Sequence, residues 1–169
     1  MPDAIFSGGV SPILASEDDI LAACDEALSM APSSFPPTLP PAKELLGAPQ
    51  WYAFEYAAWP LGEGIRQAFS KDRRLRRKAN LLAKVAEVAT CRNLRRGRQS
   101  FVMALGFVDA AGHANALSEF LADPDVDGQV VDTLLKMRTP DYVRAVAPLL
   151  QSNKAFVRRL AKRYVERYS

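Results

Sequence analysis

Two consecutive stretches near the C-terminus repeat one pattern, and this pattern decides the fold. The first runs Leu117-Ser-Glu-Phe-Leu121, Ala122-Asp-Pro-Asp-Val-Asp-Gly128, Val130-Val-Asp-Thr-Leu-Leu-Lys-Met137. The second runs Val146-Ala-Pro-Leu-Leu150, Gln151-Ser-Asn-Lys-Ala155, Val157-Arg-Arg-Leu-Ala-Lys-Arg-Tyr164. In each, an apolar helix ends in leucine, a short turn follows, and an amphipathic helix opens on valine. A helix–turn–helix unit that recurs about every 30 residues predicts stacked repeats, because one unit cannot bury its apolar face alone.

Two looser copies of the pattern lie upstream. Residues 97–106 read as the second helix of such a unit, because they are apolar in the middle and end in Ala104-Leu-Gly106 before a turn at 109–112. Residues 69–79 form the least regular copy. The repeats therefore account for most of the chain.

A leucine-rich helix, an Asp-containing turn, a Val-Arg pair and an Ala-Leu-Gly ending together resemble HEAT-like repeats, including the short bilin-lyase type. The resemblance covers roughly residues 60–168, although Val130-Val131 lacks the arginine that Val157-Arg158 carries. It implies an all-α chain folded as a right-handed α–α superhelix, with an N-terminal helical and Pro-rich extension. It also implies a scaffold that binds other molecules, since such proteins are rarely enzymes.

The length of 169 residues fits a single domain. We expect an acidic helix and a Pro-rich connection over residues 1–48, and helical repeats over 49–169. Ser16 precedes three acidic residues, which is typical of a helix N-cap, and the apolar spacing predicts a helix that continues to Met30. Five prolines within 31–41 favour an extended linker, with a docking peptide for a partner domain as the alternative.

The composition is that of an ordinary globular chain, with 49% apolar and 24% charged residues. No apolar run approaches the roughly 18 residues of a membrane helix, and the N-terminus lacks the basic start and apolar centre of a secretory signal. Cys24 and Cys91 are not spaced as metal ligands, so we expect reduced thiols, with a disulfide as the alternative. These features favour a cytoplasmic location and predict no membrane partner.

The net charge of +3 conceals a strong asymmetry along the chain. Residues 1–60 hold one basic and eight acidic residues, a net charge of −7, whereas residues 61–99 hold twelve basic and three acidic residues, a net charge of +9. Residues 100–169 are nearly balanced, with nine basic and eight acidic residues. A basic middle of this kind predicts an acidic partner.

Seven basic residues at helical intervals are the candidate contacts for that partner. They are Arg73, Arg76, Arg77, Lys84, Arg95, Arg96 and Arg98. Arginine forms planar, bidentate contacts with phosphate and carboxylate groups. Two alternatives remain open: a solvated face with local ion pairs, or pairing with the acidic first 60 residues of the same chain.

Aromatic residues are concentrated just before this basic region. Trp51, Tyr52, Tyr56 and Trp59 fall on neighbouring stripes of a predicted helix, which we expect Pro60 to end. Two interpretations of these rings remain open. The helix packs between its neighbours, or it presents an aromatic wall that binds a base or a peptide side chain. Glu55 lies among these rings, and burial would raise its pKa. Beyond Pro60, a long helix with one basic face is expected from Arg73 to Thr90.

Residues that carry catalysis or bind metals are scarce. His113 is the only histidine, and its place near a helix start favours a capping or surface role over a general base. Three aspartates within 123–127 suggest calcium, but the segment lacks the length and terminal glutamate of an EF-hand loop, so a turn cap is favoured. We predict no cofactor and no metal.

Three functions are consistent with these patterns. The favoured one is a non-catalytic interaction module whose basic face binds an acidic protein or nucleic acid. The second is a DNA-binding enzyme of the HEAT-like alkylpurine glycosylase type, in which the aromatic residues and Glu55 or Asp72 would act on a damaged base. The third is a small regulatory or inhibitory subunit.

Overall fold

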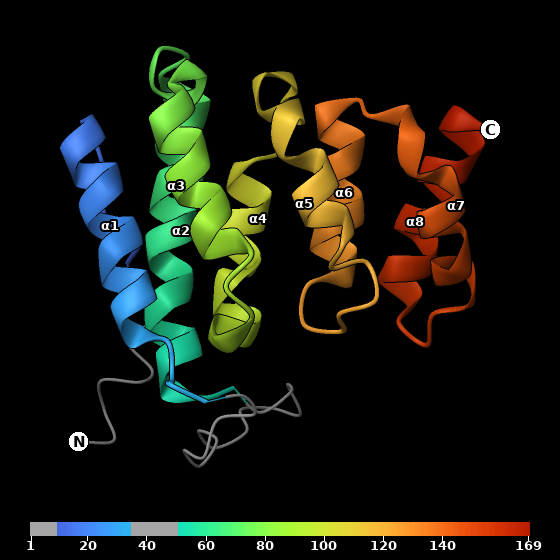
Figure 1. Cartoon of the computed structure of the whole chain (residues 1–169), viewed down its shortest axis with the longest axis horizontal. Coiled ribbons are helices and arrows are strands. Elements are labelled where there is room, and N and C mark those ends of the chain that lie inside the picture. Colours follow the sequence, from blue (N-terminus) through green and yellow to red (C-terminus); the bar gives the residue numbers. More distant parts are fainter. Residues whose placement is uncertain (1–9, 35–50) are drawn as a thin grey trace.

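The computed structural model describes residues 10–34 and 51–169, and every regular element within these two ranges is helical. The all-α prediction is confirmed. Helices α1 to α8 and five short 3-10 helices, η1 to η5, follow one another along the chain (Figure 1).

The first helix, α1 (Glu17–Met30), begins and ends where the sequence predicts. The Ser16 hydroxyl accepts a hydrogen bond from the Asp19 amide at 3.1 Å, and the Asp19 carboxylate accepts one from the Ser16 amide at 2.9 Å. This reciprocal pair satisfies two amides at the helix start. Ile20, Cys24 and Ala27 are fully buried on the inner face. The predicted Pro-rich linker lies outside the described residues from position 35 onward.

The second helix, α2 (Ala53–Lys71), corrects the prediction that the aromatic helix ends at Pro60, because it continues through that proline without interruption. Proline removes one backbone donor from the helix interior. Packing against α4 stabilises the helix around this proline: the Ser100 hydroxyl donates to the Trp59 carbonyl at 2.7 Å, and Gly62 allows α4 to approach α2 closely. Packing against α4 therefore outweighs the helix-breaking tendency of Pro60 and Gly62.

The single helix predicted over Arg73–Thr90 is also wrong. The segment forms a 3-10 turn, η1 (Leu75–Arg77), and a separate helix, α3 (Ala79–Ala89). Lys78 between them is extended, with φ −77° and ψ 114°, which interrupts the helical hydrogen bonding. The predicted apolar positions Leu75 and Leu82 are buried nonetheless.

The rest of the chain consists of shorter elements joined by tight turns. They are η2 (Arg92–Arg98), α4 (Gln99–Ala104), η3 (Val108–His113), α5 (Ala114–Ser118), α6 (Asp127–Met137), η4 (Pro140–Tyr142), α7 (Val143–Val146), η5 (Ala147–Gln151) and α8 (Ala155–Tyr168).

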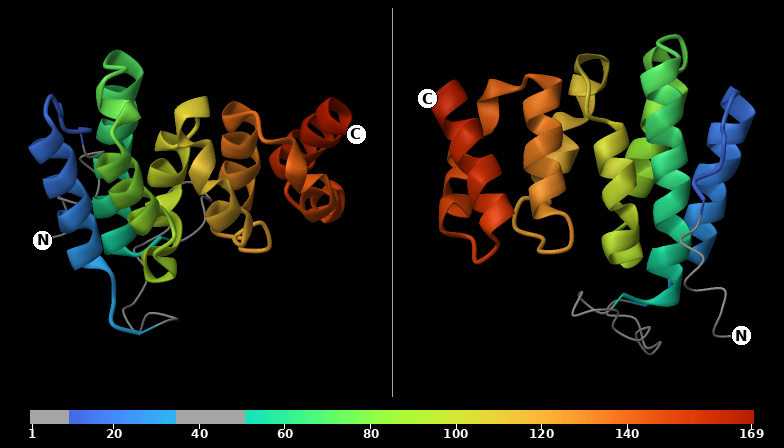
Figure 2. Two further views of the ribbon diagram at one scale, coloured as in Figure 1. Left: turned by 45° about the horizontal axis from the view of Figure 1, so that its top comes forward. Right: turned by 180° about the vertical axis from the view of Figure 1, so that it is seen from behind.

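The helices pair into successive hairpins that lie side by side in two layers (Figure 1). Helices α2, α4, α6 and α8 pack against one another in order and form one layer, which faces the viewer in the right-hand view of Figure 2. Helices α1, α3, α5 and α7 lie on the other side. The N-terminal and C-terminal helices stand at opposite ends of the row (Figure 1).

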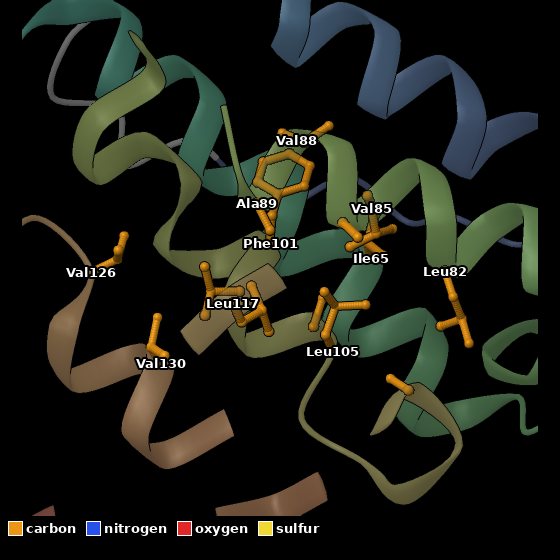
Figure 3. Packing of buried hydrophobic residues seen from close by; sticks show 14 of the residues in the cluster. Ile65, Leu82, Val85, Val88, Ala89, Phe101, Leu105, Leu117, Val126 and Val130 are labelled. Carbon is orange, nitrogen blue, oxygen red and sulfur yellow. The ribbon is translucent and has the colours of Figure 1, made fainter. Parts of the chain in front are cut away.

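The core runs between the two layers along the whole row. Ile65 on α2, Val85 on α3 and Phe101 on α4 meet in its first half, and Leu117 and Val130 continue it toward α6 (Figure 3). Burying one such side chain stabilises the fold by about 1.5–3 kcal/mol. Most of the leucines and valines in the predicted repeats are buried, while Leu149, Leu150 and Leu160 are half-buried. Within the described ranges, no helix is both long and apolar enough to cross a bilayer.

Candidate functional site

The seven basic residues predicted as one face lie in three separate places. Arg73, Arg76 and Arg77 lie beyond the C-terminal end of α2, Lys84 lies on α3, and the arginines of η2 lie near the start of α4. Each group has different partners.

The most buried of the seven is Arg98, which has no solvent exposure. Its guanidinium donates to the Asp123 carboxylate and to the carbonyls of Ala89 (3.2 Å) and Arg95 (3.1 Å). The group also lies 4.7 Å from the centre of the Phe120 ring. Burial lowers the pKa of Arg98, and the Asp123 carboxylate opposes that shift. All of its polar contacts are internal, so Arg98 holds the fold together and is closed to a partner.

Arg95 and Arg96 face the same acidic turn. Both approach the Asp125 carboxylate, at 3.5 and 3.6 Å, and Arg95 also lies over the Tyr52 ring. Arg95 adopts φ 49° and ψ −126°, a conformation that strains any residue with a side chain. The surrounding ion pairs and the aromatic ring hold this strained backbone in place.

Glu55 completes this cluster from the start of α2. Its carboxylate is fully buried and accepts hydrogen bonds from the backbone amides of Tyr52 (2.6 Å) and Arg96 (2.9 Å). Burial raises the pKa of Glu55, while the two amides and the Arg95 and Arg96 side chains oppose the shift. One carboxylate oxygen therefore caps the start of α2, and the other joins α2 to η2.

The acidic turn at 123–127 is the shared counter-ion of these groups. The turn contacts the η2 arginines, and its Asp127 carboxylate also forms an ion pair with the Lys154 ammonium at 3.0 Å. Lys154 immediately precedes α8, and Arg98 immediately precedes α4. The carboxylates considered for calcium thus join the N-terminal ends of α4, α6 and α8 through ion pairs.

Lys84 pairs with Asp25 on α1 at 2.9 Å and with Glu87 at 3.1 Å. Lys78 pairs with Glu17, also on α1. Acidic residues of α1 therefore neutralise Lys78 and Lys84 at this end of the molecule. This agrees in part with the alternative that the acidic N-terminal residues pair with the basic middle of the chain.

The four aromatic residues at and just before the start of α2 are all partly exposed, and three of them contact other rings or a guanidinium. The Trp51 and Tyr56 ring centres lie 5.2 Å apart. Tyr52 stacks on Phe54 and lies beneath the Arg95 guanidinium, 5.1 Å from it. The Trp59 backbone carbonyl accepts a hydrogen bond from Ser100 on α4.

A cleft lies at the opposite ends of the same helices. It has a volume of about 520 Å³ and lies beside the C-terminal ends of α2, α6 and α8 and the turn that follows α4. Its walls carry six basic side chains and two acidic ones, a net charge of +4. The basic residues are Arg73, Arg76, Lys136, Arg138, Arg163 and Arg167, and the acidic residues are Asp109 and Asp132. We call this site the basic cleft.

The two carboxylates of the basic cleft are already paired. Asp109 lies 3.8 Å from the Nε of Arg76 and 3.3 Å from that of Arg77, just outside the cleft. Asp132 pairs with Lys136 at 2.6 Å, one helical turn along α6. The Arg76 guanidinium also lies over the Phe107 ring at 5.5 Å. Two of the six cations are therefore neutralised locally.

The other four, Arg73, Arg138, Arg163 and Arg167, make no ion pair with any residue in the described ranges. Arg138 ends α6 in the left-handed conformation, with φ 60°, which is costly for a residue other than glycine or asparagine. A smaller hollow of about 210 Å³ adjoins the cleft and adds Arg66 from α2, which is paired with Glu63 at 2.6 Å. The positive charge without an ion pair therefore lies beside the C-terminal ends of α2, α6 and α8.

Four of the six basic residues of the cleft were not predicted as binding residues. Arg73 and Arg76 were among the candidates, but Lys136, Arg138, Arg163 and Arg167 were not. A signal was available, because aligning Val130 with Val157 places Lys136 and Arg163 at the same position of two successive repeats. Stacked repeats bring equivalent positions side by side.

The walls of the basic cleft, as far as the structure describes them, carry no histidine, cysteine or hydroxyl side chain. The groups present can bind and orient an anion. Comparison of the chain with protein-family models, with curated proteins and with solved structures found no match in any of the three.

Proposed function

We propose that this protein is a non-catalytic binding module in which degenerate HEAT-like hairpins stack into a scaffold, and that its basic cleft holds an acidic segment of a partner protein. The paired helices and their two layers support the repeat assignment, since each hairpin buries its apolar face against the next.

One observation carries the proposal: the basic cleft has a surplus of positive charge that the protein does not neutralise. Helices α2, α6 and α8 end beside it, and each helix C-terminus carries about −0.5 of an elementary charge. These three ends offset roughly −1.5 of the +4 in the cleft. A substantial positive charge remains for an external anion.

An acidic protein segment fits this cleft better than a nucleic acid does. Base stacking needs open aromatic faces. Phe107, the aromatic residue in these walls, lies beneath Arg76, and the aromatic group of α2 lies at the other end of that helix.

The test is a titration of the full chain with a fluorescein-labelled oligoglutamate peptide, followed by anisotropy at low and moderate salt. We expect the double variant Arg138→Gln/Arg163→Gln to weaken binding about tenfold or more, and moderate salt to weaken it in both proteins. Arg144→Gln is the matched control, because Arg144 is exposed on α7 and does not line the cleft. A labelled DNA oligonucleotide is titrated in parallel.

Two outcomes would reject this function. The first is tighter binding of DNA than of oligoglutamate, which would indicate a nucleic-acid interface. The second is equal loss of oligoglutamate binding in the control and the double variant, which would show a diffuse charge effect rather than a site.

A further inference from the structure

We infer that the anion recognised by the basic cleft is a phosphomonoester, as carried by a phosphorylated side chain of the partner segment. This inference rests on the proposed function and names the chemistry of the same site. Its starting point is the set of four arginines that lack an ion pair in the described ranges: Arg73, Arg138, Arg163 and Arg167.

Charge is the first argument. Four like-charged side chains around one hollow repel one another, and the walls offer them no free carboxylate. A carboxylate ligand brings one negative charge, whereas a phosphomonoester brings about −1.5 to −2 at neutral pH. The dianion therefore relieves more of the repulsion for each group bound.

Hydrogen-bonding capacity is the second argument. Each guanidinium presents five N–H donors in a fixed plane, which match the oxygen edge of a phosphate in pairs. A phosphomonoester offers three terminal oxygens, each able to accept more than one hydrogen bond, and a carboxylate offers two. All four free cations are arginine, although the chain places lysines elsewhere on α8, such as Lys162.

The placement of the four side chains is the third argument. They come from the segment after α2, from the end of α6 and from two successive turns of α8, so the stacking of separate repeats brings them together. The volume of about 520 Å³ lies within the range of small-ligand sites, which suits one phosphorylated side chain and its neighbours.

Backbone strain at the rim of the cleft is consistent with this role. Arg138 occupies a left-handed position where glycine is the usual residue. Its side chain makes no ion pair or hydrogen bond with the described residues that would compensate for the conformation. Such strain is common where a side chain must point at a ligand.

The experiment compares two probes of similar size, phenyl phosphate and benzoate, at constant ionic strength. Backbone amide shifts of the ¹⁵N-labelled full chain report where each probe binds and how tightly. We expect phenyl phosphate to shift the amides around Arg138 and Arg163 and to bind at least about tenfold more tightly than benzoate. Arg138→Gln/Arg163→Gln should abolish this preference, and Arg144→Gln should keep it.

The outcomes separate this inference from the proposed function. Equal affinity for the two probes, combined with oligoglutamate binding at the cleft, overturns the phosphate assignment and leaves the acidic-segment function standing. Failure of both probes and of oligoglutamate overturns both. Tighter binding of a short oligothymidylate than of phenyl phosphate would also overturn the inference, because it would assign the site to phosphodiesters of a nucleic acid.

Discussion

The guanidinium of Arg98 is wholly buried and is hydrogen-bonded to the carboxylate of Asp123, 25 positions later in the chain. Arg98 immediately precedes α4, and Asp123 lies in the turn before α6. The pair therefore joins two successive hairpins at the N-terminal ends of their inner helices. A shift of one hairpin along the other would separate the two charges, so the pair favours the observed alignment.

Removing one partner of this pair should be more damaging than removing both. Asp123→Asn leaves a buried guanidinium without a counter-charge, and we expect it to lower the free energy of unfolding by about 3–5 kcal/mol. The double variant Arg98→Met/Asp123→Leu removes both charges and should recover most of that loss. Urea denaturation followed by circular dichroism measures each value. A double variant that is no more stable than the single one would contradict the assignment.

The second prediction concerns pH and the buried Glu55 carboxylate. Its pKa in the folded state is raised by burial above the ordinary value near 4.5. The folded protein therefore holds this proton more firmly than the unfolded chain does. The stability that this proton contributes is complete below the unfolded pKa and is lost as the pH rises through the raised folded pKa.

Measuring unfolding free energy against pH for the wild type and for Glu55→Gln isolates this contribution. We expect the wild type to lose stability relative to the variant as the pH rises above about 4.3. Glu63→Gln provides a control of opposite sign, because Arg66 lowers the pKa of Glu63 through hydrogen bonds of 2.6 and 2.7 Å. For Glu63, the wild type should gain stability relative to the variant as the pH rises from the lowered folded pKa to the unfolded value. Parallel curves for wild type and Glu55→Gln would refute the prediction.

The third prediction tests the close approach of α2 and α4. A methyl group at Gly62 would lie 2.8 Å from the backbone nitrogen of Phe101, so the two helices would have to move apart. We expect Gly62→Ala to destabilise the protein by about 1–3 kcal/mol, even though alanine is the better helix former by about 1 kcal/mol. Gly112→Ala is the matched control, since nothing lies within 4 Å of the added carbon. Thermal denaturation of both variants provides the comparison.

The sequence predicts the apolar positions of this fold better than its helix boundaries. Leu117, Val130 and Val157 are buried, as the predicted repeat pattern requires. The spacing of apolar residues predicts burial correctly even where the predicted helix ends are wrong. The continuity of α2 could not be read from Pro60 alone. It depends on Ser100 and on the space at Gly62, both of which are contacts between segments far apart in the sequence.

The candidate site was also predictable only in part. An arginine-rich middle is visible in the sequence, but the sequence does not say which arginines find a carboxylate. Arg98 pairs with an acidic turn that lies 25 residues away, whereas Arg73 remains unpaired among the described residues. Charge counting along the chain therefore identified the right kind of residue and could not separate the buried, paired arginines from the open ones.

The last prediction separates stability from binding at Arg138. Glycine in its place removes the penalty of the left-handed backbone, so we expect Arg138→Gly to raise the free energy of unfolding by up to about 1 kcal/mol. The same variant loses one guanidinium of the basic cleft and should bind phenyl phosphate several-fold more weakly. Arg144→Gly, a substitution within the helical residues of α7, should instead lower stability by about 1 kcal/mol and leave the affinity unchanged. Chemical denaturation and the amide-shift titration, run on the same samples, measure both quantities. If Arg138→Gly binds phenyl phosphate as well as the wild type, Arg138 does not contact the anion, since a residue that contacts the anion cannot be lost without weakening the complex.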